Sequence, residues 1–169
     1  MLHKFGNTPS ELTPMRQEWM ALLARAPHTL LNDIVKPYIE SKQTEWLRRP
    51  ETGLMMIQAR VGGTGERFNL GEVTVTRCAL RLGELDDPSP VGVSYVLGRD
   101  HQHAQLAAAA DALLQDASYY VDLEVQLLEP VRQFLKQQQT SRQARAQTTK
   151  VDFFTVAREV SSGDDGEVS

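Results

Sequence analysis

The sequence predicts an α+β fold, with an antiparallel sheet of about four strands, an N-terminal helical hairpin, long C-terminal helices and an extended C-terminal arm. Two observations carry this prediction. Apolar residues recur at helical spacing near the N-terminus and again after residue 100, whereas short alternating runs bounded by turn residues lie between them. Because helices and strands occupy separate stretches of the chain, we expect α+β rather than a doubly wound parallel sheet.

The N-terminal hairpin begins at Thr13, a capping residue, which is followed by Pro14 at the favoured first helical position. Pro27 ends this first helix, and Pro37 ends or kinks a second, shorter helix around residues 30–35. The buried stripe of the first helix is expected to contain Met15, Trp19, Leu22 and Ala26.

The strands are expected to form an antiparallel meander, which is the simplest pairing for runs that follow one another closely. They cover residues 43–49, 54–61, 71–82 and 91–97. A turn over residues 50–53 separates the first strand from the second, and a loop over residues 62–70 separates the second from the third. A loop over residues 86–90 precedes the fourth strand.

The C-terminal helical region begins after Asp100, whose side chain can cap it, and continues to about Gln139 with a kink or a break at Pro130. Its apolar face contains Leu106, Ala110, Leu113, Ala117 and Tyr120. Residues 136–150 are polar and lack apolar spacing. The adjacent Phe153 and Phe154 are therefore expected to dock, either on this domain or on a partner.

Length and composition predict one domain, since the chain has 169 residues, of which 41% are hydrophobic and 24% charged. We divide it into an N-terminal tail at 1–12, a single domain at 13–139, a linker and docking arm at 140–160, and an acidic tail at 161–169 that we expect to be disordered.

The formal net charge of -4 argues against a nucleic-acid-binding protein. Cys78 is the single cysteine, so neither an intramolecular disulfide nor a pair of thiols for a metal is available. An export signal and a long apolar span are also missing from the sequence. We therefore expect a cytoplasmic protein that binds neither nucleic acid nor membrane.

The most unusual local feature is a glycine-rich loop formed by Gly62, Gly63, Thr64 and Gly65, with Arg67 close behind. Its glycines permit positive φ angles, so successive amides can form a concave anion-binding nest beside the arginine. The spacing matches neither a P-loop nor a dinucleotide-binding fingerprint. A loop whose glycines serve only backbone geometry is the competing interpretation.

Glu72, Thr74, Thr76 and Cys78 share one face of the third predicted strand, because strand side chains repeat with period two. A solvent-exposed sheet face or a protein interface explains this polar stripe better than a catalytic row does. For Cys78 to act as a nucleophile, a cation or a helix end would have to lower its pKa.

Four arginines are candidates for binding phosphate, because guanidinium groups match phosphate oxygens bidentately. They are Arg60, Arg67, Arg77 and Arg99. The sequence leaves open whether they converge, and surface ion pairs are the alternative for each of them.

Asp100, His101 and His103 raise the possibility of a metal-dependent enzyme. In a helix, however, the two histidines lie about 200° apart, and a third ligand is missing locally. We favour Asp100 as a helix cap and both histidines as exposed residues, and we expect no metal site.

Several ordered motifs resemble the G subunit of the bacterial carbon-phosphorus lyase core complex. The central motif runs from Arg60 to Arg77, and Gly98-Arg99-Asp100 and Val151-Asp152-Phe153-Phe154-Thr155 follow it. Residues 49–54 and 109–115 are also similar to that family, so the resemblance covers most of residues 15–158.

This resemblance implies a role in phosphonate catabolism. The G subunit acts with the H, I and L subunits on ATP and an alkylphosphonate such as methylphosphonate. Adenine is displaced from the ribose, which gives α-D-ribose 1-methylphosphonate 5-triphosphate. In that family the G, H, I and J subunits form a symmetric core, and ATP is a substrate of the complex. No cofactor is expected on this chain alone.

The resemblance also implies that catalysis lies mainly in the I subunit and that Cys78 is replaceable. We therefore expect residues that contact a ligand or a partner, without a catalytic set. The candidates are Arg60, Gly62, Gly63, Thr64, Gly65, Arg67, Glu72, Thr74, Thr76, Arg77, Arg99 and Asp100. Two interpretations remain open: a subunit that contacts substrate, and a purely structural scaffold of the same complex.

Overall fold

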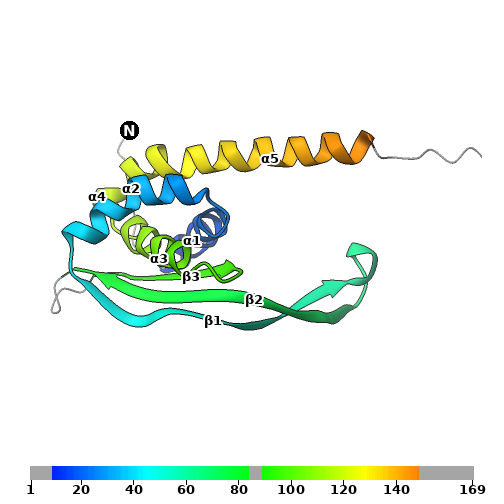
Figure 1. Cartoon of the computed structure of the whole chain (residues 1–169), viewed down its shortest axis with the longest axis horizontal. Coiled ribbons are helices and arrows are strands. Elements are labelled where there is room, and N and C mark those ends of the chain that lie inside the picture. Colours follow the sequence, from blue (N-terminus) through cyan, green and yellow to red (C-terminus); the bar gives the residue numbers. More distant parts are fainter. Residues whose placement is uncertain (1–8, 84–88, 149–169) are drawn as a thin grey trace, which may run out of the picture.

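The structure is a computed structural model that describes residues 9–83 and 89–148. Its fold is α+β, as predicted (Figure 1). The elements are α1 (Pro9–Leu23), α2 (His28–Ser41), β1 (Thr44–Arg60), the short turn η1 (Val61–Gly63), β2 (Arg67–Leu82), β3 (Val91–Leu97), α3 (His101–Leu114), α4 (Ala117–Leu123), the π turn η2 (Glu124–Leu128) and α5 (Glu129–Thr148).

The sheet is the predicted antiparallel meander, but the described residues contain three strands in the order β1-β2-β3, so the expected fourth strand is wrong. The first two predicted strands are one continuous strand, β1. Pro50 was expected to mark a turn, but it lies where the register between β1 and β2 shifts. An edge strand accommodates this proline, since β1 pairs on one side only.

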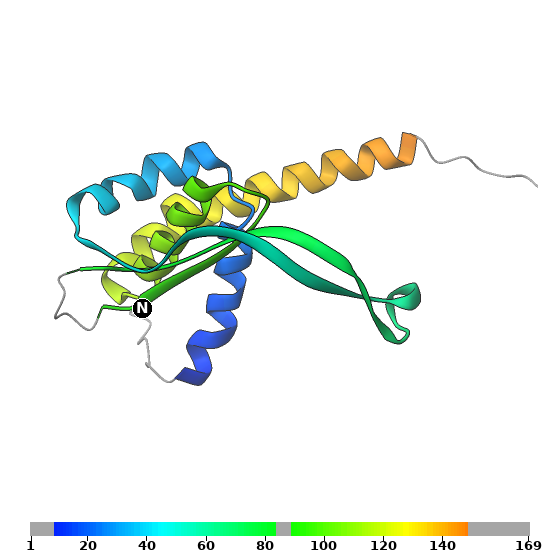
Figure 2. The same ribbon diagram turned by 60° about the horizontal axis from the view of Figure 1, so that its bottom comes forward.

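A long two-stranded arm projects from the sheet (Figures 1 and 2). β2 begins at Arg67, so the loop expected over residues 62–70 is mostly strand. β3 pairs with β2 only from Val75 to Arg81. We define the arm as residues 54–74, where β1 and β2 pair with each other alone.

The helices cover one face of the sheet, and α3 lies directly against it (Figure 1). Nearly all of α3 from His103 to Leu114 is buried. Gly92 allows β3 to approach closely, because a Cβ at this position would lie 1.9 Å from the Ala108 carbonyl oxygen. The alanine-rich face of α3 is therefore packed core.

Two helix boundaries differ from those expected. α1 begins at Pro9, so Pro14 lies inside the helix rather than at its start. α2 continues through Pro37 to Ser41. These helices pack against α3, and burial of their apolar stripes outweighs the cost of an internal proline.

The C-terminal helix is longer than expected, because α5 continues to Thr148, beyond Gln139. The break expected near Pro130 is present as the π turn η2. This turn ends at Leu128, and α5 begins at the next residue, Glu129. Proline lacks an N–H, which explains why the regular α pattern is interrupted there. Phe153 and Phe154 lie outside the described residues.

Among residues 9–83 and 89–148, no helix is long and apolar enough to cross a lipid bilayer.

Candidate functional site

The polar stripe on β2 faces the helices. Thr76 is 0% exposed and Cys78 is 1% exposed, so the expectation of a solvent-exposed face is wrong at these two positions. The alternation itself is correct, since Leu80 and Leu82 continue the same buried face. Glu72 is exposed and Thr74 is partly buried, because the stripe passes from the covered sheet onto the arm.

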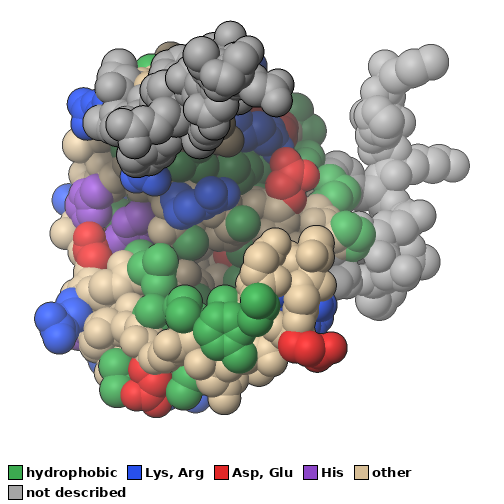
Figure 3. All heavy atoms as spheres, turned by 90° about the vertical axis from the view of Figure 1, so that its right-hand side faces the viewer, with side chains coloured by type: hydrophobic (Ala, Val, Ile, Leu, Met, Phe, Trp, Pro, Cys, Tyr) green, Lys and Arg blue, Asp and Glu red, His purple; other side chains and the backbone are tan. Residues whose placement is uncertain are grey.

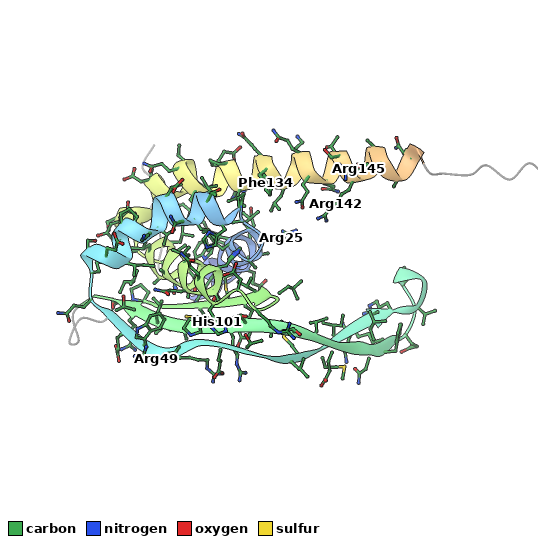
Figure 4. All side chains as sticks on the ribbon, in the orientation of Figure 1. Arg25, Arg49, His101, Phe134, Arg142 and Arg145 are labelled. Atoms are coloured by element: carbon green, nitrogen blue, oxygen red, sulfur yellow. The ribbon has the colours of Figure 1, made fainter. Side chains whose placement is uncertain are left out.

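Thr76 organises the turn that enters α3. Its hydroxyl donates a hydrogen bond of 2.8 Å to the Gly98 carbonyl oxygen. The Thr52 hydroxyl lies 3.3 Å from the Thr76 hydroxyl and 2.9 Å from Nε2 of His101. Figure 4 shows His101 where α3 meets the sheet. Thr76 therefore fixes the turn before α3 against the sheet, and its hydroxyl is not available to a ligand.

Cys78 is a neutral, buried thiol. Burial raises its pKa to about 11, because the thiolate would lose its hydration in the core. A nucleophilic cysteine requires the opposite shift. The structure thus supports the view that Cys78 is not a catalytic residue.

Asp100 caps α3 as predicted, since its carboxylate accepts a hydrogen bond of 2.9 Å from the His103 backbone N–H. The expectation that His103 is exposed is wrong. Its ring is buried, and Nε2 lies 2.8 Å from the Leu23 carbonyl oxygen, whereas His101 is exposed. The two imidazoles therefore contact different partners, and the described part of the chain holds no group of three residues suited to a metal.

The four candidate arginines do not form one cluster. Arg60 and Arg67 lie directly opposite each other at the tip of the arm. Arg77 is ten residues further along β2, about 33 Å away at ordinary strand rise, and its Nε donates to Glu51 at 2.7 Å. Arg99 is exposed in the turn between β3 and α3. Only the Arg60–Arg67 pair is brought together.

The glycine-rich loop turns the chain at the tip of the arm. Gly62 and Gly63 adopt φ angles of 58° and 83°, in the left-handed region that favours glycine. The Gly65 N–H donates to the Val61 carbonyl oxygen at 2.8 Å, and Nη1 of Arg60 donates to the Gly65 carbonyl oxygen at 3.1 Å. The loop is a well-formed turn in which Gly62, Gly63 and Thr64 are exposed, and none of the residues that the structure describes encloses it.

The most connected polar residue of the described core is Asp111, which is 0% exposed and which the sequence pattern did not single out. Its Oδ1 accepts from Nε1 of Trp19 at 2.8 Å and from Nε of Arg16 at 3.2 Å. Its Oδ2 accepts from Nη2 of Arg16 at 2.7 Å and from the Val93 N–H at 2.8 Å. One carboxylate therefore joins α1, β3 and α3. An acid on the buried face of an alanine-rich helix is the local signal for it.

An open groove of about 530 Å³ lies between α1 and α5, and no sequence prediction included it. Leu22 and Leu135 are among its lining residues, together with Arg25, Lys136 and Arg142. Figure 4 shows Arg25 and Arg142 on the side of α5 that faces the sheet. Helical spacing between residues 135 and 142 would have indicated this face, but only if the helix had been extended beyond Gln139.

Comparison with known proteins gives the family. The model of the family described as phosphonate metabolism protein PhnG matches residues 14–159. The chain belongs to the PhnG family. It is also 38% identical over 143 residues to the alpha-D-ribose 1-methylphosphonate 5-triphosphate synthase subunit PhnG of Rhizobium meliloti (strain 1021), an alignment that covers 85% of this chain and 88% of the relative. The PhnG match includes the arm, the glycine-rich loop and the capped helix α3.

Proposed function

We propose that this chain is a subunit of an alpha-D-ribose 1-methylphosphonate 5-triphosphate synthase. In this reaction an alkylphosphonate such as methylphosphonate displaces adenine from ATP. The chain acts with H and I subunits in a core complex that also contains J, and functionally with L. Its place of action is the cytoplasm.

The observation that carries this proposal is the extent of the match to the Rhizobium relative, which is named as a subunit of that synthase. The similarity runs through nearly the whole of both chains, so it does not depend on one short motif. Such an extended match favours a shared role over a shared fold alone.

The described side chains agree with a subunit that needs partners. The buried thiol of Cys78 is protonated, and His103 is occupied by a backbone contact. Arg60 and Arg67 are exposed at the tip of the arm, where β1 and β2 pair only with each other among the described residues. Catalysis requires reacting groups held together in a shaped site, so we expect the isolated chain to have no turnover.

Reconstitution tests the proposal. Purified H, I and L subunits are mixed with ATP and methylphosphonate, with and without this chain, and released adenine is measured by chromatography. We expect adenine release only in the complete mixture. The same rate without the chain would contradict a required role, and an active chain in the absence of the other subunits would show that it carries its own catalytic site.

A structural scaffold of the same complex is the second candidate. The ion pair of Arg77 with Glu51 and the buried hydroxyl of Thr76 favour it, because both groups are engaged within the chain. Under this alternative, replacing Arg67 and Arg77 together leaves adenine release intact in a correctly assembled complex. Loss of release from an intact complex would exclude it.

A further inference from the structure

The arm carries its tip well beyond the rest of the sheet. The pairs Leu54–Thr74 and Arg60–Arg67 mark its two ends. Six residue steps separate them along β1, which corresponds to about 20 Å at ordinary strand rise. β3 ends opposite Val75, so this whole length is a ribbon of two strands. A ribbon of this kind is at most marginally stable alone and gains stability by packing against another surface.

One face of the arm combines apolar side chains with the paired arginines. Leu54, Met56 and Arg60 alternate along β1 and therefore share the face that continues from the helix-covered side of the sheet. We call this the inner face of the arm. Leu54 is 66% exposed and Met56 is 48% exposed. Methionine and arginine are enriched at protein interfaces, so this face has the composition of a docking surface.

The two arginines at the tip lack a compensating acid in the described residues. Arg60 and Arg67 are directly opposed across the ribbon and both are exposed. Arg60 donates a hydrogen bond to the Gly65 carbonyl oxygen, and the guanidinium of Arg67 pairs with no described residue. Like charges placed directly opposite each other are unfavourable. An anion held between them would remove that repulsion.

The loop beside this pair is open to close approach. A Cβ at Gly62 or Gly63 would meet no atom within 4 Å, so nothing in the described chain covers their backbone. Figure 3, which views the arm from its tip, shows hydrophobic side chains at this end and Lys and Arg side chains across a recess from them. A bulky group presented by another protein can therefore reach the arginines and the glycine backbone together.

We propose that the inner face of the arm docks on a partner subunit and that Arg60 and Arg67 bind a phosphate group of the ATP held there. This inference rests on the proposed function. A carboxylate is satisfied by one bidentate guanidinium, whereas a terminal phosphate has three oxygens and up to two negative charges. Two guanidiniums beside an exposed glycine backbone match the phosphate better.

The test uses the reconstituted complex with the variant Arg60→Gln/Arg67→Gln. We expect assembly to be unchanged in size-exclusion chromatography and the KM for ATP in adenine release to rise about 10-fold or more, the effect of losing charge-assisted hydrogen bonds. Inorganic triphosphate is the second probe. It should compete with ATP in the wild-type complex and lose about the same factor of affinity in the variant.

The matched control is Lys36→Gln/Arg49→Gln, which removes the same charge from exposed positions off the arm. It should leave the KM for ATP and inhibition by triphosphate unchanged. If the arm variant fails to assemble, the arginines bind the partner's own acids and the phosphate proposal is wrong. It is also wrong if the assembled variant keeps its KM. A wild-type mixture that releases no adenine would instead refute the proposed function.

Discussion

Charged side chains have opposite environments at Asp111 and at the tip of the arm. Asp111 is completely buried, and its two oxygens accept hydrogen bonds from Arg16 and Trp19 of α1 and from the Val93 N–H of β3. Arg60 and Arg67 are exposed and face each other with like charge. Burying a carboxylate costs free energy unless hydrogen bonds or a cation compensate it. Exposed guanidiniums stay hydrated, so they need no partner within the chain.

The contrast separates residues that stabilise the fold of this chain from residues that we expect to bind a partner. Asp111 and its partners satisfy one another within the core, so substitutions there act on the free energy of unfolding. The arm leaves apolar side chains and both arginines exposed, so substitutions there act on association. Measuring both quantities for each variant tests this separation.

The largest expected effect on stability comes from Asp111→Ala. Removing the carboxylate leaves the Trp19 indole and the Val93 N–H unpaired in the core, and we expect unfolding to become easier by about 3 to 5 kcal/mol. Urea denaturation of the isolated chain measures the loss. If the alanine variant does not fold, Asp111→Asn should fold with a smaller loss, since it keeps the shape and an acceptor.

The matched control is Asp122→Ala, which removes the same group from an exposed position. Its effect should be within about 0.5 kcal/mol, as is usual for surface substitutions. A loss below about 1 kcal/mol for Asp111→Ala would mean that the buried network contributes little, and the contrast with the arm would fail.

An intermediate effect is expected at Cys78 in alkaline solution. Burial raises its pKa from 9.0 to about 11, so the folded chain holds this proton more tightly than the unfolded chain. The stability from this group is therefore complete below pH 9 and is lost as pH rises towards 11. At pH 10 the loss should be roughly 1 kcal/mol.

Urea denaturation at several pH values measures this loss in the wild type and in Cys78→Ala. The alanine variant has no thiol to titrate, so its curve should be flatter between pH 9 and pH 11. Parallel curves for the two proteins would show that ionisation of Cys78 does not limit alkaline stability.

The sequence predicted local features better than long-range ones. The Asp100 cap and the alternation along β2 depend on nearby residues, and both were predicted correctly. The partners of Asp111 include Arg16, which lies 95 residues away, so no local pattern identifies the pair. The buried contact of His103 with Leu23 is equally remote, at 80 residues.

The errors on the sheet have one physical cause. Glycine and proline were taken to end strands, but a continuous backbone ladder overrides this tendency when the strand lies at an edge or on a ribbon. Pro50 remains within β1, and the glycine-rich segment shortens to the turn before Arg67. The arm buries little against the rest of the described chain, so its apolar pattern could not predict where the strands pair.

The smallest effect on stability is expected on the arm, from Leu54→Thr/Met56→Thr. Both side chains are already about half exposed or more, and threonine favours strands, so the free energy of unfolding should change by less than about 0.5 kcal/mol. Retention of the chain in the reconstituted complex should nevertheless fall sharply, because the inner face loses its apolar contact. Size-exclusion chromatography measures retention.

Met55→Thr/Phe68→Thr provides the comparison on the same ribbon, because these two residues lie on the opposite face of the arm. We expect this variant to assemble normally. If both variants assembled equally well, the arm would not be the docking element. If both failed, the partner would enclose the ribbon from two sides rather than bind one face. Only selective loss in the inner-face variant places the partner beside Arg60 and Arg67.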